Sequence, residues 1–274
     1  MTDLNVVYER FEKIKTQTIC IETQTYEYAI TENNGISVIL INGAGGPIDG
    51  WMKIWRLLRE KHHVFCYNRP GIGQSSAPIN PQTGLQMVAE LQAILHALEI
   101  KPPYVLVGHS LGGFIAELFA RHYPEEVKSV VLLESSTIDD VLSSGKRKNK
   151  KPKNATQALT EVFQVNETIA QLQIAPSFPA LPLTVVAGTH PVAKHFMPTK
   201  HVFSRIEHLR KASQLSPHGK FIIAHHSGHF PQLSDSKLVA EVIREVSDTK
   251  QEVRFDREVS DTKPEVQFET NTKT

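Results

Sequence analysis

Residues 102–113 read PPYVLVGHSLGG, and the rest of the chain is best interpreted outward from this stretch. Residues 104–107 form a short apolar run that is typical of a buried strand. Apolar residues at helical spacing follow shortly afterwards. Between the two, Ser110 lies in a Gly-x-Ser-x-Gly pattern with Gly108 and Gly112. The pattern predicts a strand, a tight turn and a helix, with the serine exposed at the carboxyl end of the strand.

The two glycines suit a strained turn, because a side chain at either position would collide with neighbouring strands or with the start of the helix. The same pattern also fits an ordinary strand-to-helix turn in which the serine caps the helix. Order and spacing elsewhere in the chain must therefore decide between the two interpretations.

Composition limits the classes of function. The chain has 274 residues, of which 40% are hydrophobic, and a formal net charge of +1, which fits one globular domain with a large core. Near-neutral charge gives no reason to expect a nucleic-acid partner. We expect no secretory signal and no membrane span. Cys20 and Cys66 lie in predicted strands without metal-ligand spacing, so we expect buried free thiols and a cytoplasmic protein.

Strands and helices alternate along most of the chain. Residues 16–30 carry two β-rich runs that predict an antiparallel pair at a sheet edge. The strands expected after it cover residues 36–41, 63–67, 104–107, 127–133, 183–187 and 221–224. Helical patterns separate several of these strands. The sequence therefore predicts an α/β protein with a mostly parallel central sheet and helices on both faces.

Four sequence blocks carry a family resemblance. They are ILINGAGGP at 39–47, VFCYNRPGIGQSS at 64–76, YVLVGHSLGGFIAELFARHYPEEVKSVVLLESS at 104–136 and HHSGHFPQLSDSKLVAEVIREV at 225–246. Together they resemble the α/β-hydrolase fold family from about Thr16 to Val246. The resemblance implies a serine hydrolase that acts on esters, thioesters, amides or lactones. Such chemistry requires no metal and no organic cofactor, and its partner would be a small-molecule acyl substrate.

Ser110 needs a base, because a hydroxyl is a poor nucleophile at neutral pH. We expect this base to be His229, which follows the strand at 221–224 in a short Ser-Gly-His loop. The family pattern brings that loop back over the nucleophile. His225 and His226 are the competing histidines, and we expect them to pack or be solvated at the strand end.

Backbone N–H groups are the best donors for an oxyanion, because they need no reorganisation during the reaction. We expect one donor from Leu111, which follows the serine at the helix start. The second should come from the glycine-rich loop at 42–46, at Ala44. A phosphate-binding loop is the alternative, but no Walker lysine follows it. After the next strand, Asn68 and Arg69 are expected to tie loops together beneath the site.

The acid of the triad is the least conventional element. Relatives usually carry an aspartate after the strand at 183–187, whereas this chain reads AGTHPVAKHF there. Some members of the family take the acid from the preceding strand end, where Glu134 stands, and we favour this residue. Asp139 or Asp140, or no acid at all, are the alternatives. The acid would fix the His229 tautomer and stabilise its imidazolium form.

We expect a single domain at 1–246 with a small cap inserted at 136–181. Within the insertion, a basic run at 145–154 favours a solvated loop, and apolar residues at 159–172 predict an amphipathic helix. A tandem repeat, REVSDTKQEVRFD followed by REVSDTKPEVQFE, favours a polar tail at 247–274. The overall hypothesis is a serine hydrolase of the α/β-hydrolase type. The alternatives are a non-catalytic binding or signalling protein on this fold, and a cofactorless C–C hydrolase or acyltransferase.

Overall fold

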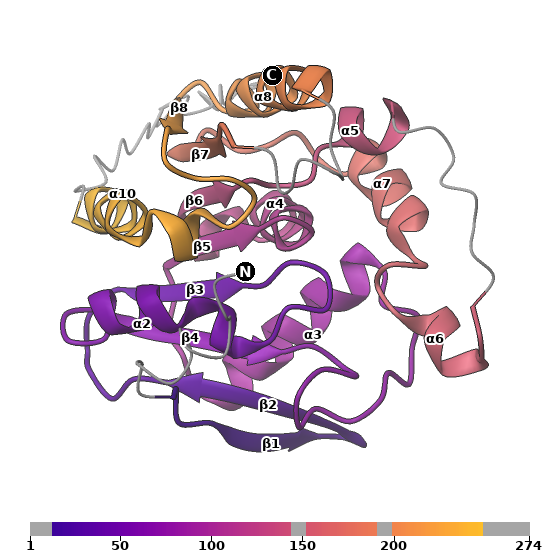
Figure 1. Ribbon diagram of the computed structural model, residues 1–274. Coiled ribbons are helices and arrows are strands. Elements are labelled where there is room, and N and C mark those ends of the chain that lie inside the picture. Colours follow the sequence, from indigo (N-terminus) through magenta and orange to yellow (C-terminus); the bar gives the residue numbers. More distant parts are fainter. Residues whose placement is uncertain (1–12, 144–151, 191–198, 249–274) are drawn as a thin grey trace, which may run out of the picture.

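The computed structural model describes residues 13–143, 152–190 and 199–248 (Figure 1). Within these residues one sheet runs through the molecule in the order β1-β2-β4-β3-β5-β6-β7-β8. Its strands are β1 (Gln17–Ile21), β2 (Gln24–Ile30), β3 (Ser37–Ile41), β4 (His63–Asn68), β5 (Tyr104–His109), β6 (Val127–Leu133), β7 (Leu183–Gly188) and β8 (Gly219–Ala224).

Strand directions confirm the predicted sheet. β1 and β2 form an antiparallel pair at one edge, β2 pairs antiparallel with β4, and every other neighbouring pair is parallel. Because parallel strands end at the same edge of a sheet, the loops after β3, β5, β6, β7 and β8 gather on one side of the molecule. Ligand sites in such sheets lie outside the carboxyl ends of the strands.

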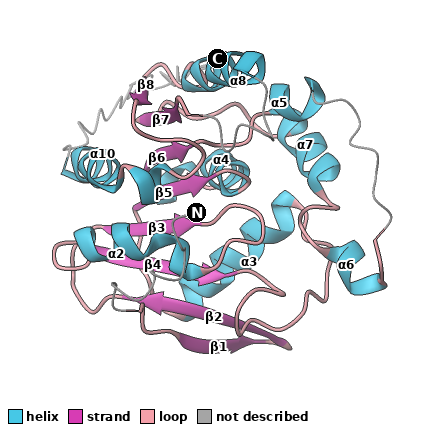
Figure 2. Cartoon of the chain, in the orientation of Figure 1, coloured by secondary structure: helices cyan, strands magenta, loops and turns pink. Residues whose placement is uncertain are grey.

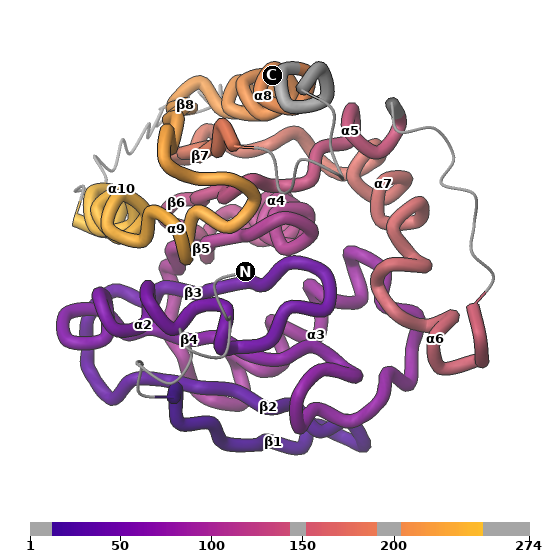
Figure 3. Tube along the Cα trace, viewed as in Figure 1, coloured from indigo at the N-terminus to yellow at the C-terminus, as the bar shows by residue number. Residues whose placement is uncertain are grey.

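Helices cover both faces of the sheet, as the sequence predicts (Figure 2). One face packs against α2 (Met52–Leu58) and α10 (Ser236–Asp248), and the other against α3 (Gly84–Ala97) and α4 (Gly112–His122). The remaining elements are η1 (Ile48–Trp51), η2 (Pro124–Glu126), α5 (Ile138–Ser143), α6 (Ala155–Leu159), α7 (Val165–Ile174), α8 (Thr199–Ser213) and α9 (Pro231–Ser234), whose order the tube in Figure 3 follows.

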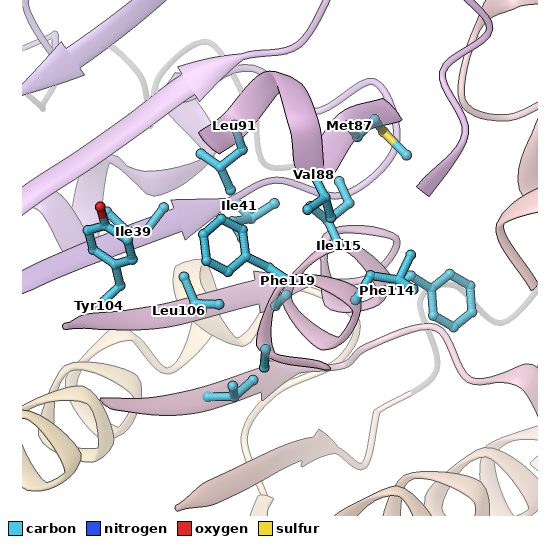
Figure 4. Packing of buried hydrophobic residues seen from close by; sticks show 14 of the residues in the cluster. Ile39, Ile41, Met87, Val88, Leu91, Tyr104, Leu106, Phe114, Ile115 and Phe119 are labelled. Atoms are coloured by element: carbon cyan, nitrogen blue, oxygen red, sulfur yellow. The ribbon is translucent and has the colours of Figure 1, made fainter. Parts of the chain in front are cut away.

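Alternate side chains of the central strands enter different cores. Ile39 and Leu106 face the α3 and α4 side, where they pack near Phe119 (Figure 4). Val38 and Val105 face the α2 and α10 side. Full burial of an apolar side chain contributes roughly 1.5–3 kcal/mol. The strand ends are therefore held by packing on both faces, which makes them a rigid base for side chains at the sheet edge.

Three details differ from the sequence-based expectation. The helix expected across 159–172 is two helices, α6 and α7, separated by a turn at 160–164. That turn directs the Glu161 carboxylate into the protein, where it pairs with Arg69. Helix α8 was not expected at all. Cys66 is buried, but Cys20 is exposed, because it lies on edge strand β1, whose side chains are mostly solvated.

The region between β6 and β7 contains α5, α6 and α7, which lie to one side of the sheet in Figure 1. Helix α7 packs against α3, and the Thr168 hydroxyl accepts a hydrogen bond from the Gly84 amide at 2.9 Å. Most of the basic run and the tandem repeat lie outside the described residues. In the described parts of the chain, none of the helices combines the length and apolar character needed to span a bilayer.

Candidate active site

Ser110 occupies a strained turn between β5 and α4. Its φ angle is 51°, in the left-handed region that residues other than glycine rarely adopt. Its amide donates to the Leu133 carbonyl at 3.1 Å. A Cβ atom at Gly108 would lie 2.6 Å from the Gly112 carbonyl oxygen, and one at Gly112 would collide with the Ile41 carbonyl. The glycines are therefore required by close packing, and the turn leaves Ser110 partly exposed at the carboxyl end of β5.

His229 lies in the loop between β8 and α9. Its backbone carbonyl accepts a hydrogen bond from His109 Nε2 at 2.7 Å, and the two rings are 5.0 Å apart. Burial and the nearby His229 hold the pKa of His109 at about 3, so this ring is neutral at physiological pH. His109, directly before Ser110, thereby fixes the His229 loop over the elbow. The competing His225 and His226 are both exposed.

Glu134 follows β6 and is fully buried. Its backbone is left-handed, with a φ of 46°, and its Oε1 accepts the Gly188 amide at 2.5 Å. Its Oε2 lies 3.5 Å from His229 Nδ1. The alternative acids lie elsewhere: Asp139 pairs with Lys211 at 2.7 Å and Asp140 with His208 at 2.6 Å, both on α8. Of the three candidates, only Glu134 is brought to His229 among the described contacts.

A buried ion pair shapes the loop at 42–46. The Arg69 guanidinium donates from Nη1 to the Asn42 carbonyl at 2.8 Å and from Nη2 to the Gly43 carbonyl at 2.6 Å. It also holds both carboxylate oxygens of Glu161, from Nε at 2.5 Å and from Nη2 at 3.0 Å. Glu161 in turn accepts the Gly45 amide at 2.6 Å. We refer to Arg69 and Glu161 as the loop clamp. It agrees with the expectation that Arg69 ties loops together.

The clamp leaves the Ala44 amide of this loop without an acceptor among the described residues. In a trans peptide the C=O and the following N–H point in opposite directions. Since the Gly43 carbonyl points at Arg69, the Ala44 amide points away from it, and it makes no hydrogen bond to any described residue. The Leu111 amide also lacks an acceptor among the described residues. It points away from the Ser110 carbonyl, which accepts hydrogen bonds from the amides of Gly113 and Ser136. Both predicted oxyanion donors are therefore available.

The serine and histidine are not hydrogen-bonded to each other. Across residues 13–143, 152–190 and 199–248, the Ser110 side chain makes no hydrogen bond. Contacts between a nucleophile and its base are often long in the absence of substrate and shorten in its presence. The structure thus brings His229 to Glu134 and its loop to the elbow, while the Ser110 to His229 contact itself is not formed.

Comparison with known proteins agrees with this fold. A family model described as "alpha/beta hydrolase fold" matches residues 36–162, which include the glycine-rich loop, the elbow and Glu134. The chain has the α/β-hydrolase fold. It is 31% identical over 107 residues to the uncharacterized protein YqjL of Bacillus subtilis (strain 168), covering 39% of this chain and 42% of that protein.

Two further relatives of this α/β-hydrolase carry names of enzymes. The (lyso)-N-acylphosphatidylethanolamine lipase of Mus musculus is 30% identical over 101 residues, covering 35% of this chain and 29% of that protein. The crystal structure of the enol-lactonase from Burkholderia xenovorans LB400 has a TM-score of 0.60 at 16% identity, covering 84% of this chain and 99% of that one. The chain spans less than half the length of the curated relatives it matches.

The α/β-hydrolase site contains a second buried arginine that sequence reasoning missed. Arg205 lies on α8 and is 8% exposed. Its Nη1 forms an ion pair with Glu134 Oε2 and lies 3.5 Å from His229 Nδ1. Its Nε and Nη2 are buried, and neither donates a hydrogen bond to a residue that the structure describes. The Glu134 carboxylate is therefore shared between a histidine and an arginine.

A sequence signal for α8 exists. Val202, Ile206 and Leu209 recur at spacings of four and three residues, which is typical of an amphipathic helix. No comparable signal indicates that Arg205 reaches Glu134, because that contact depends on how α8 packs against β7. The loop clamp is similarly nonlocal, since 92 residues separate its partners.

Proposed function

We propose that this chain is a serine hydrolase that cleaves a carboxylic ester, or a related thioester, amide or lactone, through an acyl-enzyme. The observation that carries the proposal is the left-handed turn at Ser110, together with two backbone amides, those of Ala44 and Leu111, that donate to no described residue. Free amides at a serine elbow are suited to a developing oxyanion. Lipase and lactonase names among the relatives support hydrolysis as the reaction class.

In the proposed reaction, Ser110 Oγ attacks the substrate carbonyl carbon while His229 Nε2 takes the hydroxyl proton. The amides of Ala44 and Leu111 hold the oxyanion. His229 then gives its proton to the leaving group as the tetrahedral intermediate collapses to an acyl-enzyme. Water activated by His229 releases the acid and restores the serine. Glu134 would accept a hydrogen bond from His229 Nδ1 and so keep Nε2 free to act as the base.

Labelling with a fluorophosphonate probe tests the proposal. We expect the intact protein to be labelled at Ser110 and the Ser110→Ala variant to remain unlabelled. Ser136, a second serine beside the elbow, contacts Ser110 through its backbone amide, which donates to the Ser110 carbonyl. It provides the matched control, because Ser136→Ala should label like the wild type. Equal labelling of Ser110→Ala would contradict the assignment of Ser110 as the nucleophile. No labelling of the wild type would favour a non-catalytic binding protein.

The acid is tested separately with Glu134→Gln. By analogy with triads in which the acid is replaced by its amide, turnover of an activated ester should fall about 10²–10⁴-fold. Asp140→Asn should have far less effect, because Asp140 pairs with His208 instead. Wild-type turnover in Glu134→Gln would remove Glu134 from the triad while leaving the assignment of Ser110 intact. Esters of graded acyl length would then define the preferred substrate.

A further inference from the structure

The two buried arginines of the site use their guanidinium groups differently. Arg69 binds the Glu161 carboxylate with its side-on edge, donating from Nε at 2.5 Å and from Nη2 at 3.0 Å. The same pair of atoms in Arg205, Nε and Nη2, is buried and donates to none of the described residues. Arg205 as a whole is 8% exposed.

Buried donors without acceptors are rare, because leaving one unpaired typically costs more than a hydrogen bond contributes. Here two adjacent donors of one cation lie parallel, which is the geometry that matches two oxygens of a planar group. The loop clamp demonstrates, within the same chain, which group that edge binds: a carboxylate. Arg205 also lies beside the proposed base, because its Nη1 is 3.5 Å from His229 Nδ1.

We propose that the Nε and Nη2 edge of Arg205 binds a carboxylate carried by the substrate, which makes this hydrolase selective for esters of anionic acids. This inference rests on the proposed function, because it concerns the substrate of the same site. Glu134 already offsets one unit of positive charge on Arg205. A singly charged carboxylate therefore suits the remaining donors better than a doubly charged phosphate.

The proposal also connects substrate binding to the triad. Glu134 Oε2 faces both Arg205 and His229, and in this structure its shorter contact is with Arg205. A substrate carboxylate on the free edge would compete with Glu134 for the same cation. Glu134 would then be more available to His229 Nδ1. An anionic substrate would thus favour the arrangement that keeps His229 Nε2 as the acceptor for the Ser110 proton.

The test uses a graded series of para-nitrophenyl monoesters of dicarboxylic acids. Each is paired with a neutral ketone analogue in which acetyl replaces the distal carboxylate. At the best chain length, we expect the wild type to prefer the anion in kcat/KM by about tenfold or more, the scale of charge-assisted hydrogen bonds. Arg205→Met should bring that ratio close to one, whatever the absolute rates. Arg205→Lys keeps the charge but lacks the edge, so the ratio should fall without vanishing.

Arg210→Met is the matched control, because Arg210 lies on the same helix, is partly exposed and contacts the Phe221 ring instead of Glu134. Its ratio should equal that of the wild type. The proposal is overturned if no chain length shows an anion preference, if Arg205→Met retains it, or if Arg210→Met loses it equally.

A binding measurement that needs no turnover completes the test. Free monocarboxylates should slow fluorophosphonate labelling of wild-type Ser110, whereas the corresponding amides should not. In Arg205→Lys, carboxylates should protect several-fold less. Stronger protection by inorganic phosphate than by any carboxylate would overturn the choice of ligand. Labelling at Ser110 without carboxylate protection would reject this inference alone, whereas absence of labelling would reject the proposed function itself.

Discussion

Arg69 and Arg205 are each buried beside a glutamate at the same sheet edge, yet their surroundings differ. Arg69 places every one of its nitrogens in hydrogen bonds, to Glu161 and to two loop carbonyls. Arg205 places only Nη1 against Glu134 and His229. A cation whose donors are all used holds the chain in one conformation, whereas a cation with free donors can still bind something. The comparison separates a structural arginine from one available for ligand binding.

The largest effect is expected from opening the loop clamp. Arg69→Met leaves the buried Glu161 carboxylate without its cation, and removing one partner of a buried pair typically costs about 3–5 kcal/mol. Urea unfolding would measure the loss. Adding Glu161→Gln to the Arg69→Met variant should restore part of it, because the uncompensated charge is then gone. A change below about 0.5 kcal/mol in the single variant would contradict a structural role for the clamp.

A second effect concerns His109, which contacts the His229 loop. Its pKa is lowered from 6.5 to about 3, mainly by burial and next by His229. Between about pH 3 and pH 6.5, the unfolded chain therefore binds a proton at His109 that the folded chain does not bind. Stability from this group is fully present above pH 6.5 and is lost as the pH falls toward 3. Urea titrations should show a loss on the order of 2–3 kcal/mol by about pH 4.

His109→Gln isolates this contribution, because the glutamine Nε2 can replace the histidine Nε2 as donor to the His229 carbonyl but does not titrate. The variant should have a shallower pH dependence of the free energy of unfolding over the same acidic range. An unchanged slope would show that His109 is protonated in the folded state, and that it does not hold the His229 loop as a neutral ring.

Arg205→Met should cost less stability than Arg69→Met, about 1–2 kcal/mol. It breaks the pair with Glu134, but it also removes two buried donors that have no acceptor, and Glu134 keeps the Gly188 amide. Unfolding measured under identical conditions for both variants checks the order. A loss as large as that of Arg69→Met would mean that Arg205 is a structural residue after all.

The smallest effect belongs to a solvated pair on the same helix as Arg205. The Lys211 side chain is 70% exposed and pairs with Asp139 at 2.7 Å. Exposed ion pairs contribute about 0–1 kcal/mol, so Lys211→Met should change the free energy of unfolding by less than about 0.5 kcal/mol. Because the 2.7 Å of this pair is close to the 2.5 Å between Arg69 and Glu161, a near-zero result would show that burial, rather than distance, sets the size of the effect.

Sequence and structure agree where the determining interactions are local. The elbow at Ser110 and the loop at His229 follow from glycine placement and strand-to-helix order, and the strand bounds at 127–133 match the prediction. Glu134 could be proposed because it directly follows a predicted strand. These features depend on backbone geometry, which short stretches of sequence largely determine.

Agreement ends where pairing depends on tertiary packing. The partner of Arg69 lies 92 residues away in a turn that interrupts the expected helix at 159–172. Arg205 lies on a helix that the sequence analysis did not identify, and only its packing on β7 brings it to Glu134. The spacing of charged residues along the sequence does not identify their ion-pair partners. The elbow and its histidine were therefore predictable, but the charges around them were not.

The loop clamp limits which segments can replace the one between β6 and β7. Glu161 belongs to the segment between β6 and β7, whereas Arg69 and the loop at 42–46 belong to the sheet. A chimera that receives this segment from another protein must bring an acidic residue to the same place. Without that residue, the buried guanidinium of Arg69 would have no carboxylate partner beside the candidate active site. The chimera would then lose stability even if the new segment folded well.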